Sequence, residues 1–147
     1  MIETTNLELA RKLIKKEQKP IIIKAQDNLF NRKILEYGKF DILLSPEKGE
    51  KKDKLKQLNS GLNHVLAKIA AKNSIALGVD LKEIRSMDKK EKAKQLARII
   101  QNIRICRKSK TRFACINCNN KIDVFNLLIS LGASTKQAEE AFKQFIS

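Results

Sequence analysis

A long basic segment is the feature of this sequence with the clearest chemistry. Between residues 89 and 112 a single acid, Glu91, stands among ten lysines and arginines. A solvated helix face normally mixes its charges, whereas binding to a nucleic-acid backbone needs only positive charges at phosphate spacing. Phosphate contacts are therefore predicted for two parts of this segment. One is the ridge of Lys90, Lys94 and Arg98 at i, i+4 and i+8, and the other is the cluster at residues 107–112. The ten residues are Lys89, Lys90, Lys92, Lys94, Arg98, Arg104, Arg107, Lys108, Lys110 and Arg112.

A second basic set recurs at helical spacing. His64, Lys68 and Lys72 stand at i, i+4 and i+8, which places them on one ridge of a helix. The opposite side of the same helix would carry the apolar stripe Leu62, Val65, Leu66 and Ile69. Three basic residues are common on any exposed helix, so the ridge is either an ordinary solvated face or a further phosphate contact.

Three carboxylates suggest a different chemistry. Asp27, Glu47 and Asp80 fall near the C-terminal ends of expected strands, where they could hold a divalent ion for phosphodiester hydrolysis. Asp27 could equally cap a helix, and Glu47 begins a charged loop. The sequence has no Ser/His/Asp constellation, glycine-rich phosphate loop or nucleotide fingerprint. We therefore expect no catalytic and no metal-binding residues, and keep a small metal-dependent phosphohydrolase of partial-barrel fold as an alternative.

The motif Cys115-Ile116-Asn117-Cys118 has the spacing of half a zinc site or of a redox pair. A second cysteine pair is lacking, and the single histidine is far away in the sequence. Small core residues at the end of a strand are the interpretation favoured here.

The elements that must position these side chains alternate between strands and helices. Short apolar runs predict strands at residues 21–25, 40–44, 75–79 and 112–116, and the first of these runs is β-branched. Helical periodicity predicts helices at residues 7–16, 28–37, 88–108, 121–131 and 135–146, and one more that Ser60 would cap. This alternation is typical of an α/β fold with a mostly parallel sheet. The residues that follow the strands should then gather on one face, where such sheets usually bind ligands.

The length predicts a single α/β domain, residues 1–147, with a charged mobile loop at about residues 47–58. About four strands cannot close an eight-stranded barrel, which typically needs about 250 residues. The expected fold is therefore an open parallel sheet or an incomplete, TIM-barrel-like one. Its first strand, residues 21–25, would lack a neighbour, so we expect a partner protein, a second copy or an irregular cap at this edge.

Composition supports a polyanionic partner. The 31 Lys and Arg against 16 Asp and Glu give a formal net charge of +15. We expect no membrane span, because the uncharged stretches are shorter than the roughly 20 apolar residues required. The N-terminus has no secretory pattern, which predicts a cytoplasmic location, and three cysteines, an odd number, predict reduced thiols.

Three segments, in the same order and spacing, resemble the archaeal ribonuclease P protein component 3 family. They are Phe40-Asp41-Ile42-Leu43-Leu44-Ser45-Pro46, Gly61-Leu62-Asn63-His64-Val65-Leu66-Ala67-Lys68 and Ile75-Ala76-Leu77-Gly78-Val79-Asp80-Leu81. The resemblance extends over about residues 21–141, and the segment around His64 is its most specific part. The N-terminal strand and helix units that would complete the barrel of that family are not found in this sequence.

The resemblance implies a TIM-barrel-like fold and a protein subunit of the ribonucleoprotein that matures tRNA 5′ ends. It also implies that the RNA subunit carries the catalytic magnesium, that the protein binds no cofactor, and that ribonuclease P RNA, precursor tRNA and component 2 are its partners. The favoured hypothesis is thus a noncatalytic RNA-binding subunit of ribonuclease P. The alternatives are the phosphohydrolase and a general RNA-binding protein. The expected RNA contacts are His64, Lys68, Lys72, Lys90, Lys94, Arg98, Arg104, Arg107, Lys108, Lys110 and Arg112.

Overall fold

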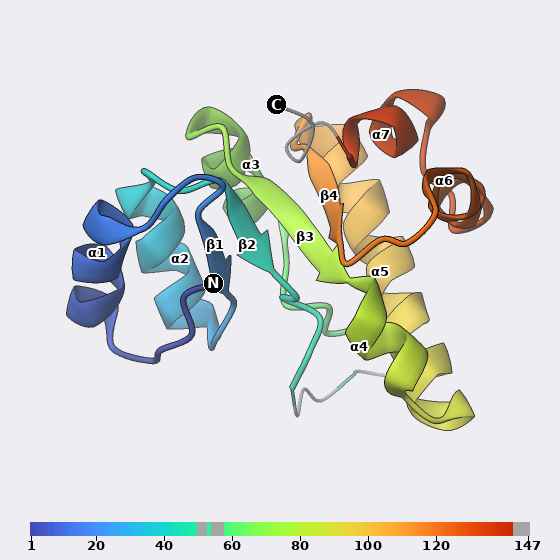
Figure 1. Ribbon diagram of the computed structural model, residues 1–147, viewed down its shortest axis with the longest axis horizontal. Helices are drawn as coiled ribbons and strands as arrows, with labels where there is room; N and C mark the ends of the chain where they lie inside the picture. Colours follow the sequence, from blue (N-terminus) through green and yellow to red (C-terminus); the bar gives the residue numbers. More distant parts are fainter. Residues whose placement is uncertain (50–52, 54–57, 143–147) are drawn as a thin grey trace.

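The computed structural model describes residues 1–49, 53 and 58–142. At the centre of these residues lies a sheet of four parallel strands, which follow the order of the chain across the sheet (Figure 1). The strands are β1 (Ile22–Lys24), β2 (Ile42–Leu44), β3 (Ala76–Asp80) and β4 (Phe113–Ile116). The predicted α/β fold with a parallel sheet is therefore confirmed.

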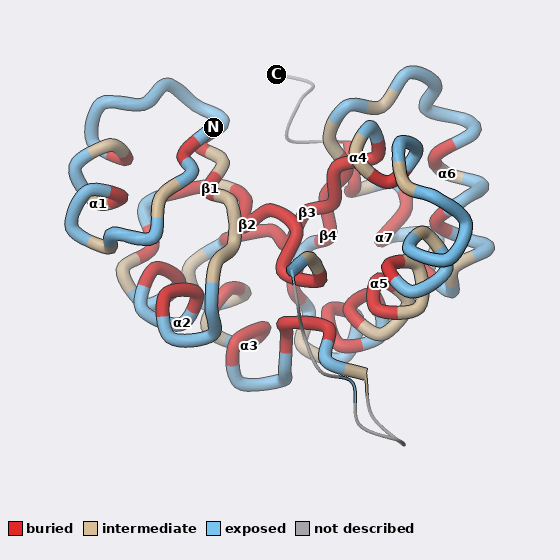
Figure 2. The backbone as a smooth tube through the Cα atoms, turned by 90° about the horizontal axis from the view of Figure 1, so that it is seen from below, coloured by how far each residue is buried: buried red, intermediate tan, exposed pale blue. Residues whose placement is uncertain are grey.

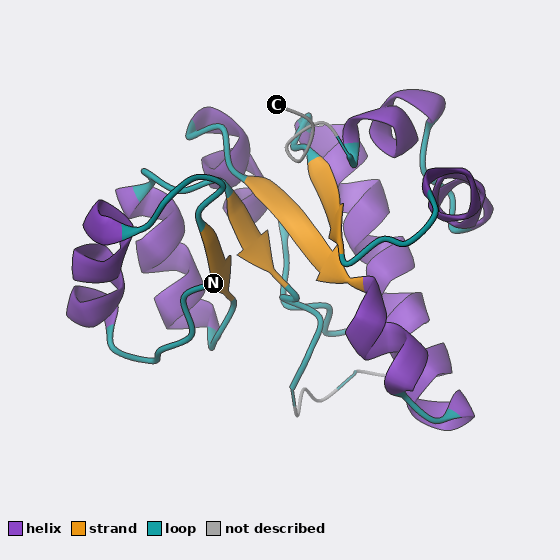
Figure 3. Ribbon diagram, viewed as in Figure 1, coloured by secondary structure: helices purple, strands orange, loops and turns teal. Residues whose placement is uncertain are grey.

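Helices flank this sheet, as Figure 3 shows, and most of them match the predicted ranges. They are α1 (Leu7–Lys16), α2 (Asn28–Tyr37), α3 (His64–Lys72), α4 (Leu81–Ser86), α5 (Lys89–Ser109), α6 (Lys121–Ser130) and α7 (Thr135–Glu140). The outer face of the sheet packs against α2, α3 and α5 through Ile34, Ala67 and Ile103, all fully buried. Figure 2 shows the resulting pattern, with buried strands inside and exposed helix surfaces outside.

Local details of the helices differ from the prediction. Asn63 and not Ser60 caps α3, because the Asn63 side chain accepts a hydrogen bond from the Leu66 N–H at 2.9 Å. Val65, expected in the apolar stripe, is 54% exposed. The short helix α4 was not predicted; its N-terminus is capped by Asp80, which accepts from two backbone N–H groups.

The predicted mobile loop at residues 47–58 lies mostly outside the described residues, and so do residues 143–146 of the predicted last helix. At the start of that loop, Glu47 is only 1% exposed. Glu47 is therefore packed inside the protein at the point where the predicted loop begins.

Segments from the two ends of the described chain cover both edges of the sheet. Ile2 forms a parallel bridge with β1, in which its N–H donates to the Ile22 carbonyl and its own carbonyl accepts from the Lys24 N–H. At the opposite edge the Cys115 N–H donates to the Ala141 carbonyl at 3.1 Å. The irregular cap, one of the three outcomes predicted for the edge at β1, is therefore the one that the structure shows.

The inner face of the sheet carries a small apolar cluster of alanine and isoleucine side chains. Ile42, Ala76 and Ala114 are fully buried there, with Ile22 and Ile116 packed against them. A Cβ atom added to Gly78 would lie 2.6 Å from Cγ2 of Ile42, which is closer than real Cβ atoms approach their neighbours. Gly78 thus lets the neighbouring strand β2 place Ile42 directly over β3.

Replacing Gly78 by alanine should lower the free energy of unfolding by about 1–3 kcal/mol, because the added methyl group overpacks this face. Urea denaturation measures the loss. An Ile42→Ala background removes the clashing atom, so the same glycine substitution should cost less there. An equal cost in both backgrounds would contradict the packing account.

Candidate nucleic-acid interface

Helices α3 and α5 pack side by side and hold two basic sets on one surface. The Thr111 hydroxyl donates to the Ala67 carbonyl at 2.7 Å, and the Arg112 guanidinium donates to the Ser74 carbonyl at 2.8 Å. At the other end of α3, the Asn102 amide donates to the Ser60 carbonyl at 3.1 Å. These hydrogen bonds set α3 alongside the C-terminal half of α5, so the two sets predicted separately lie next to each other.

The end of α5 is fixed by its backbone. Lys110 adopts a left-handed conformation, φ 59° and ψ 33°, and the Thr111 N–H closes the helix on the Cys106 carbonyl at 2.9 Å. Arg107 and Lys108 fall in the last turn, where the helix dipole favours cations. The sharp reversal then leads directly into Arg112 and β4.

We call the combined surface the α3–α5 patch. All its members are exposed, and residues 60–75 and 99–113 contain no Asp or Glu. Among the described residues no member takes part in an ion pair. Within the described part of the chain, the positive charge of this surface is therefore not neutralised by an ion pair. Its members are His64, Lys68, Lys72, Arg104, Arg107, Lys108, Lys110 and Arg112.

Arg98 was predicted to contact RNA, and its position contradicts this. It is fully buried, donating from Nη1 to the Glu47 carbonyl at 3.2 Å and from Nη2 to the Asp53 carboxylate at 3.3 Å. A helix turns about 100° per residue, so i+8 lies about 80° from i around the axis. That rotation carries Arg98 from the exposed side of Lys90 to the buried side of α5.

Because Arg98 is buried, the basic segment has two exposed parts, one near the start of α5 and one at its C-terminal end. Lys90 and Lys94 are exposed near the start of α5, and about 27 Å of helix separates Lys90 from Lys108 at 1.5 Å per residue. Acids lie near the first end: Asp88 caps α5, and the pKa of Asp53 is lowered by the Asn59 N–H and by Arg98 and Lys94. Only the C-terminal half of α5 combines dense positive charge with an absence of acids.

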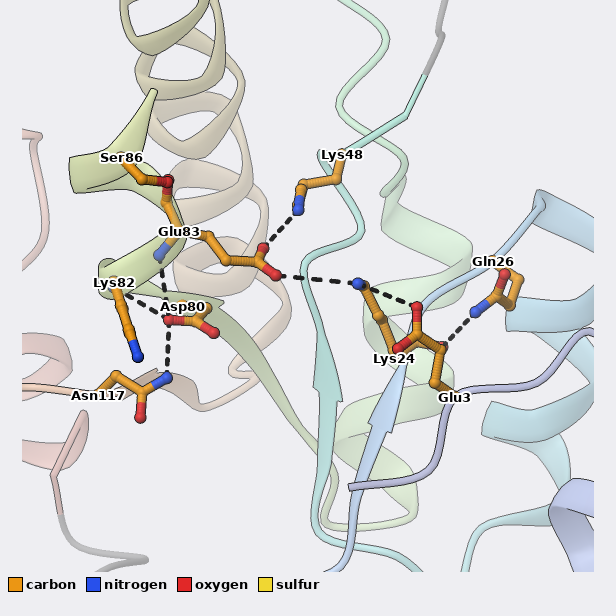
Figure 4. A network of polar contacts seen from close by, with 9 residues as sticks. All are labelled: Glu3, Lys24, Gln26, Lys48, Asp80, Lys82, Glu83, Ser86 and Asn117. Carbon is orange, nitrogen blue, oxygen red and sulfur yellow. Dashed lines mark hydrogen bonds and ion pairs between the residues drawn. The ribbon is translucent and has the colours of Figure 1, made fainter. Parts of the chain in front are cut away.

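A polar network occupies the C-terminal ends of the strands, as predicted for a parallel sheet (Figure 4). Glu83 of α4 pairs with Lys24 at 3.8 Å and with Lys48, and Lys24 also contacts Glu3 at 3.1 Å. The hydrogen bond to Glu3 and the charge of Glu83 raise the pKa of Lys24, against the effect of burial. These lysines already have anionic partners, which distinguishes them from the α3–α5 patch. Neither Lys24 nor Lys48 stood out in the sequence, because a single charge after a strand is common.

The three carboxylates of the phosphohydrolase alternative have separate structural roles. Asp27 caps α2, accepting from the Phe30 N–H at 2.7 Å. Asp80 caps α4 and accepts from the Asn117 amide at 2.9 Å, while Glu47 is buried beside Arg98. Within the described residues no three His, Cys, Asp or Glu side chains gather as metal ligands would. The geometry thus gives no support to that alternative.

Comparison with known proteins tests the resemblance to ribonuclease P protein component 3. No protein-family model matches the sequence. Ribonuclease P protein component 3 of Methanococcus maripaludis strain C6 is 26% identical over 113 residues, covering 75% of this chain and 46% of that protein. The protein of the same name from Methanocaldococcus jannaschii is 32% identical over 78 residues, covering 53% of this chain and 31% of that protein. The resemblance to ribonuclease P protein component 3 is confirmed. The chain spans about half the length of these component 3 relatives, or less.

A solved structure supports the fold. One chain of the cryo-EM structure of archaeal ribonuclease P with mature tRNA superimposes with a TM-score of 0.79 at 23% identity. The match covers 98% of this chain and 63% of that chain. The incomplete TIM-barrel-like arrangement of the four strands is thus confirmed. Within the part of the chain that the structure describes, no helix is both long and apolar enough to span a bilayer.

Proposed function

We propose that this chain is a noncatalytic, RNA-binding subunit of ribonuclease P that supports RNA-catalysed maturation of tRNA 5′ ends. The observation that carries the proposal is the α3–α5 patch, a dense set of exposed cations that form no ion pair among the described residues. Its position on a chain similar to component 3 supports the assignment to this ribonucleoprotein. Ribonuclease P RNA, precursor tRNA and component 2 are the proposed partners. The magnesium ions would then reside on the RNA, and the cytoplasmic location stays a prediction.

The patch suits contacts to phosphates. Lysine and arginine side chains on two packed helices can follow a phosphate backbone without reading bases. Arg107, Lys108 and Arg112 form its densest part, at the junction between α5 and β4. The exposed Lys90 and Lys94 would add a weaker contact, because Asp88 and Glu91 lie beside them. RNA affinity should accordingly fall steeply with salt concentration.

Competitive binding separates this role from general RNA binding. Ribonuclease P RNA and an unrelated folded RNA of equal length would compete for the purified chain at physiological salt. We expect a preference of about tenfold or more for ribonuclease P RNA, since a specific site adds contacts to the nonspecific electrostatic term. Equal affinities would instead identify a general RNA-binding protein.

We further predict that the isolated chain has no nuclease activity. Of the three carboxylates considered for metal binding, Asp27 and Asp80 cap helices and Glu47 is buried beside Arg98. Asp80→Asn should leave reconstituted cleavage nearly unchanged, since asparagine caps a helix about as well as aspartate. Cleavage of precursor tRNA at fixed magnesium measures this. An inactive variant that still folds and assembles would overturn the noncatalytic assignment.

A further inference from the structure

Cys115 and Cys118 are brought together by the turn that follows β4. Asn117 adopts a positive φ of 57°, which reverses the backbone between the strand and α6. Both cysteines line one pocket, and neither is in a disulfide. Cys115 is a buried core residue, as interpreted from the sequence, whereas Cys118 is half-buried and packs against that core. The motif therefore places two free thiols in the lining of the same pocket.

A pocket of about 430 Å³ opens onto this pair. Its walls come from both edges of the sheet, with Ile22 from β1 and Ile116 from β4, and from Phe142 and Lys121. Cys115 and Cys118 both line it. A small molecule can thus approach the sulfur atoms through a largely apolar opening.

The surroundings of the two thiols shift their pKa values in opposite directions. The hydrogen bond from Cys115 and the positive charge of Arg85 lower the pKa of Cys118, while burial and Asp80 act against this. The same hydrogen bond and burial raise the pKa of Cys115. Cys118 is therefore the more nucleophilic sulfur near neutral pH, and Cys115 is the thiol that stays protonated. Lys121 is the remaining charged group at the pocket.

We propose that Cys115 and Cys118 are a reversible dithiol–disulfide site that reacts with low-molecular-weight disulfides. The Cys118 thiolate attacks one sulfur of the small disulfide, breaks its S–S bond and releases one thiolate. Cys115 then loses its proton to solvent and attacks the Cys118 sulfur, which releases the second thiolate. The two cysteines lose two electrons in total, and the small disulfide is reduced to two thiols. Cys106 takes no part, because burial raises its pKa to about 12.

The test uses the full chain and oxidised glutathione as the probe, with free thiols then alkylated and counted by mass spectrometry. We expect an internal disulfide in the wild type, which dithiothreitol reverses, and the same product in the control variant Cys106→Ser. Cys118→Ser should react at least about tenfold more slowly, because it lacks the activated thiolate. Cys115→Ser should accumulate glutathione on Cys118.

A second measurement does not depend on the buried Cys115 variant. In Cys106→Ser, the rate of iodoacetamide reaction at Cys118 should reach half its maximum below the pH usual for a free thiol. Three results would overturn the proposal: three alkylated cysteines after exposure to oxidised glutathione, a stable wild-type adduct at Cys118, or a disulfide only between two chains.

Discussion

Replacing Arg107, Lys108 and Arg112 together by glutamine should weaken RNA binding by about tenfold to a hundredfold at moderate salt. The three side chains are exposed at the end of α5 and the start of β4, and none has an acidic partner among the described residues. For every phosphate that the variant no longer binds, the slope of log affinity against log salt should fall by roughly one unit. Titration of labelled ribonuclease P RNA at several salt concentrations measures both quantities.

A matched variant separates local contacts from total charge. Lys12, Lys15 and Lys16 are exposed on α1, which lies at the left of Figure 1, on the other side of β1, β2 and β3 from α5. Their joint replacement by glutamine removes the same formal charge. It should leave the slope nearly unchanged. Similar slopes in both triple variants would mean that the RNA does not bind at the α3–α5 patch.

The second large effect should come from Arg98→Ala, which we expect to lower the free energy of unfolding by about 3–5 kcal/mol. The guanidinium is fully buried and links α5 to Glu47 and Asp53, so its removal takes away the buried cation next to these acids. Arg98→Lys keeps the charge but loses the planar fork, and should recover only part of the stability. Urea denaturation followed by circular dichroism gives the values.

Arg104→Ala is the control, because it removes the same residue type from an exposed position of the same helix. It should change stability by less than about 0.5 kcal/mol and reduce RNA affinity. For Arg98→Lys, the salt slope should match the wild type wherever the protein is folded. A stable Arg98 variant that binds RNA poorly would show instead that Arg98 contacts RNA.

Most helices and strands could be predicted from the sequence, because segments with helical periodicity alternate with short apolar runs along the chain. Short apolar runs before Ser45 and Asp80 predict the strands β2 and β3, and Gly38 correctly marks the end of α2. Helix α4 escaped prediction because its six residues are too few to show a period. Its start depends on Asp80, which the sequence analysis considered only as a possible metal ligand.

The candidate site was predicted in its residue types but not in its extent. Charge spacing identified α5, yet it could not show that Arg98 turns inward toward Glu47 and Asp53, since both acids lie far away in the sequence. Nor could spacing show that α3 lies against the end of α5, which depends on contacts such as Thr111 to Ala67. The extent of the α3–α5 patch therefore depends on tertiary packing, which places the basic sets of α3 and α5 side by side and buries Arg98.

Reconstituted cleavage tests the central claim most directly. Ribonuclease P RNA and the other protein subunits would process precursor tRNA at limiting magnesium, with this chain present, omitted, or replaced by the Arg107/Lys108/Arg112 glutamine variant. The proposed function predicts faster cleavage with the wild-type chain than without it, and a reduced gain with the variant. Cleavage at the same rate with and without the chain would contradict it.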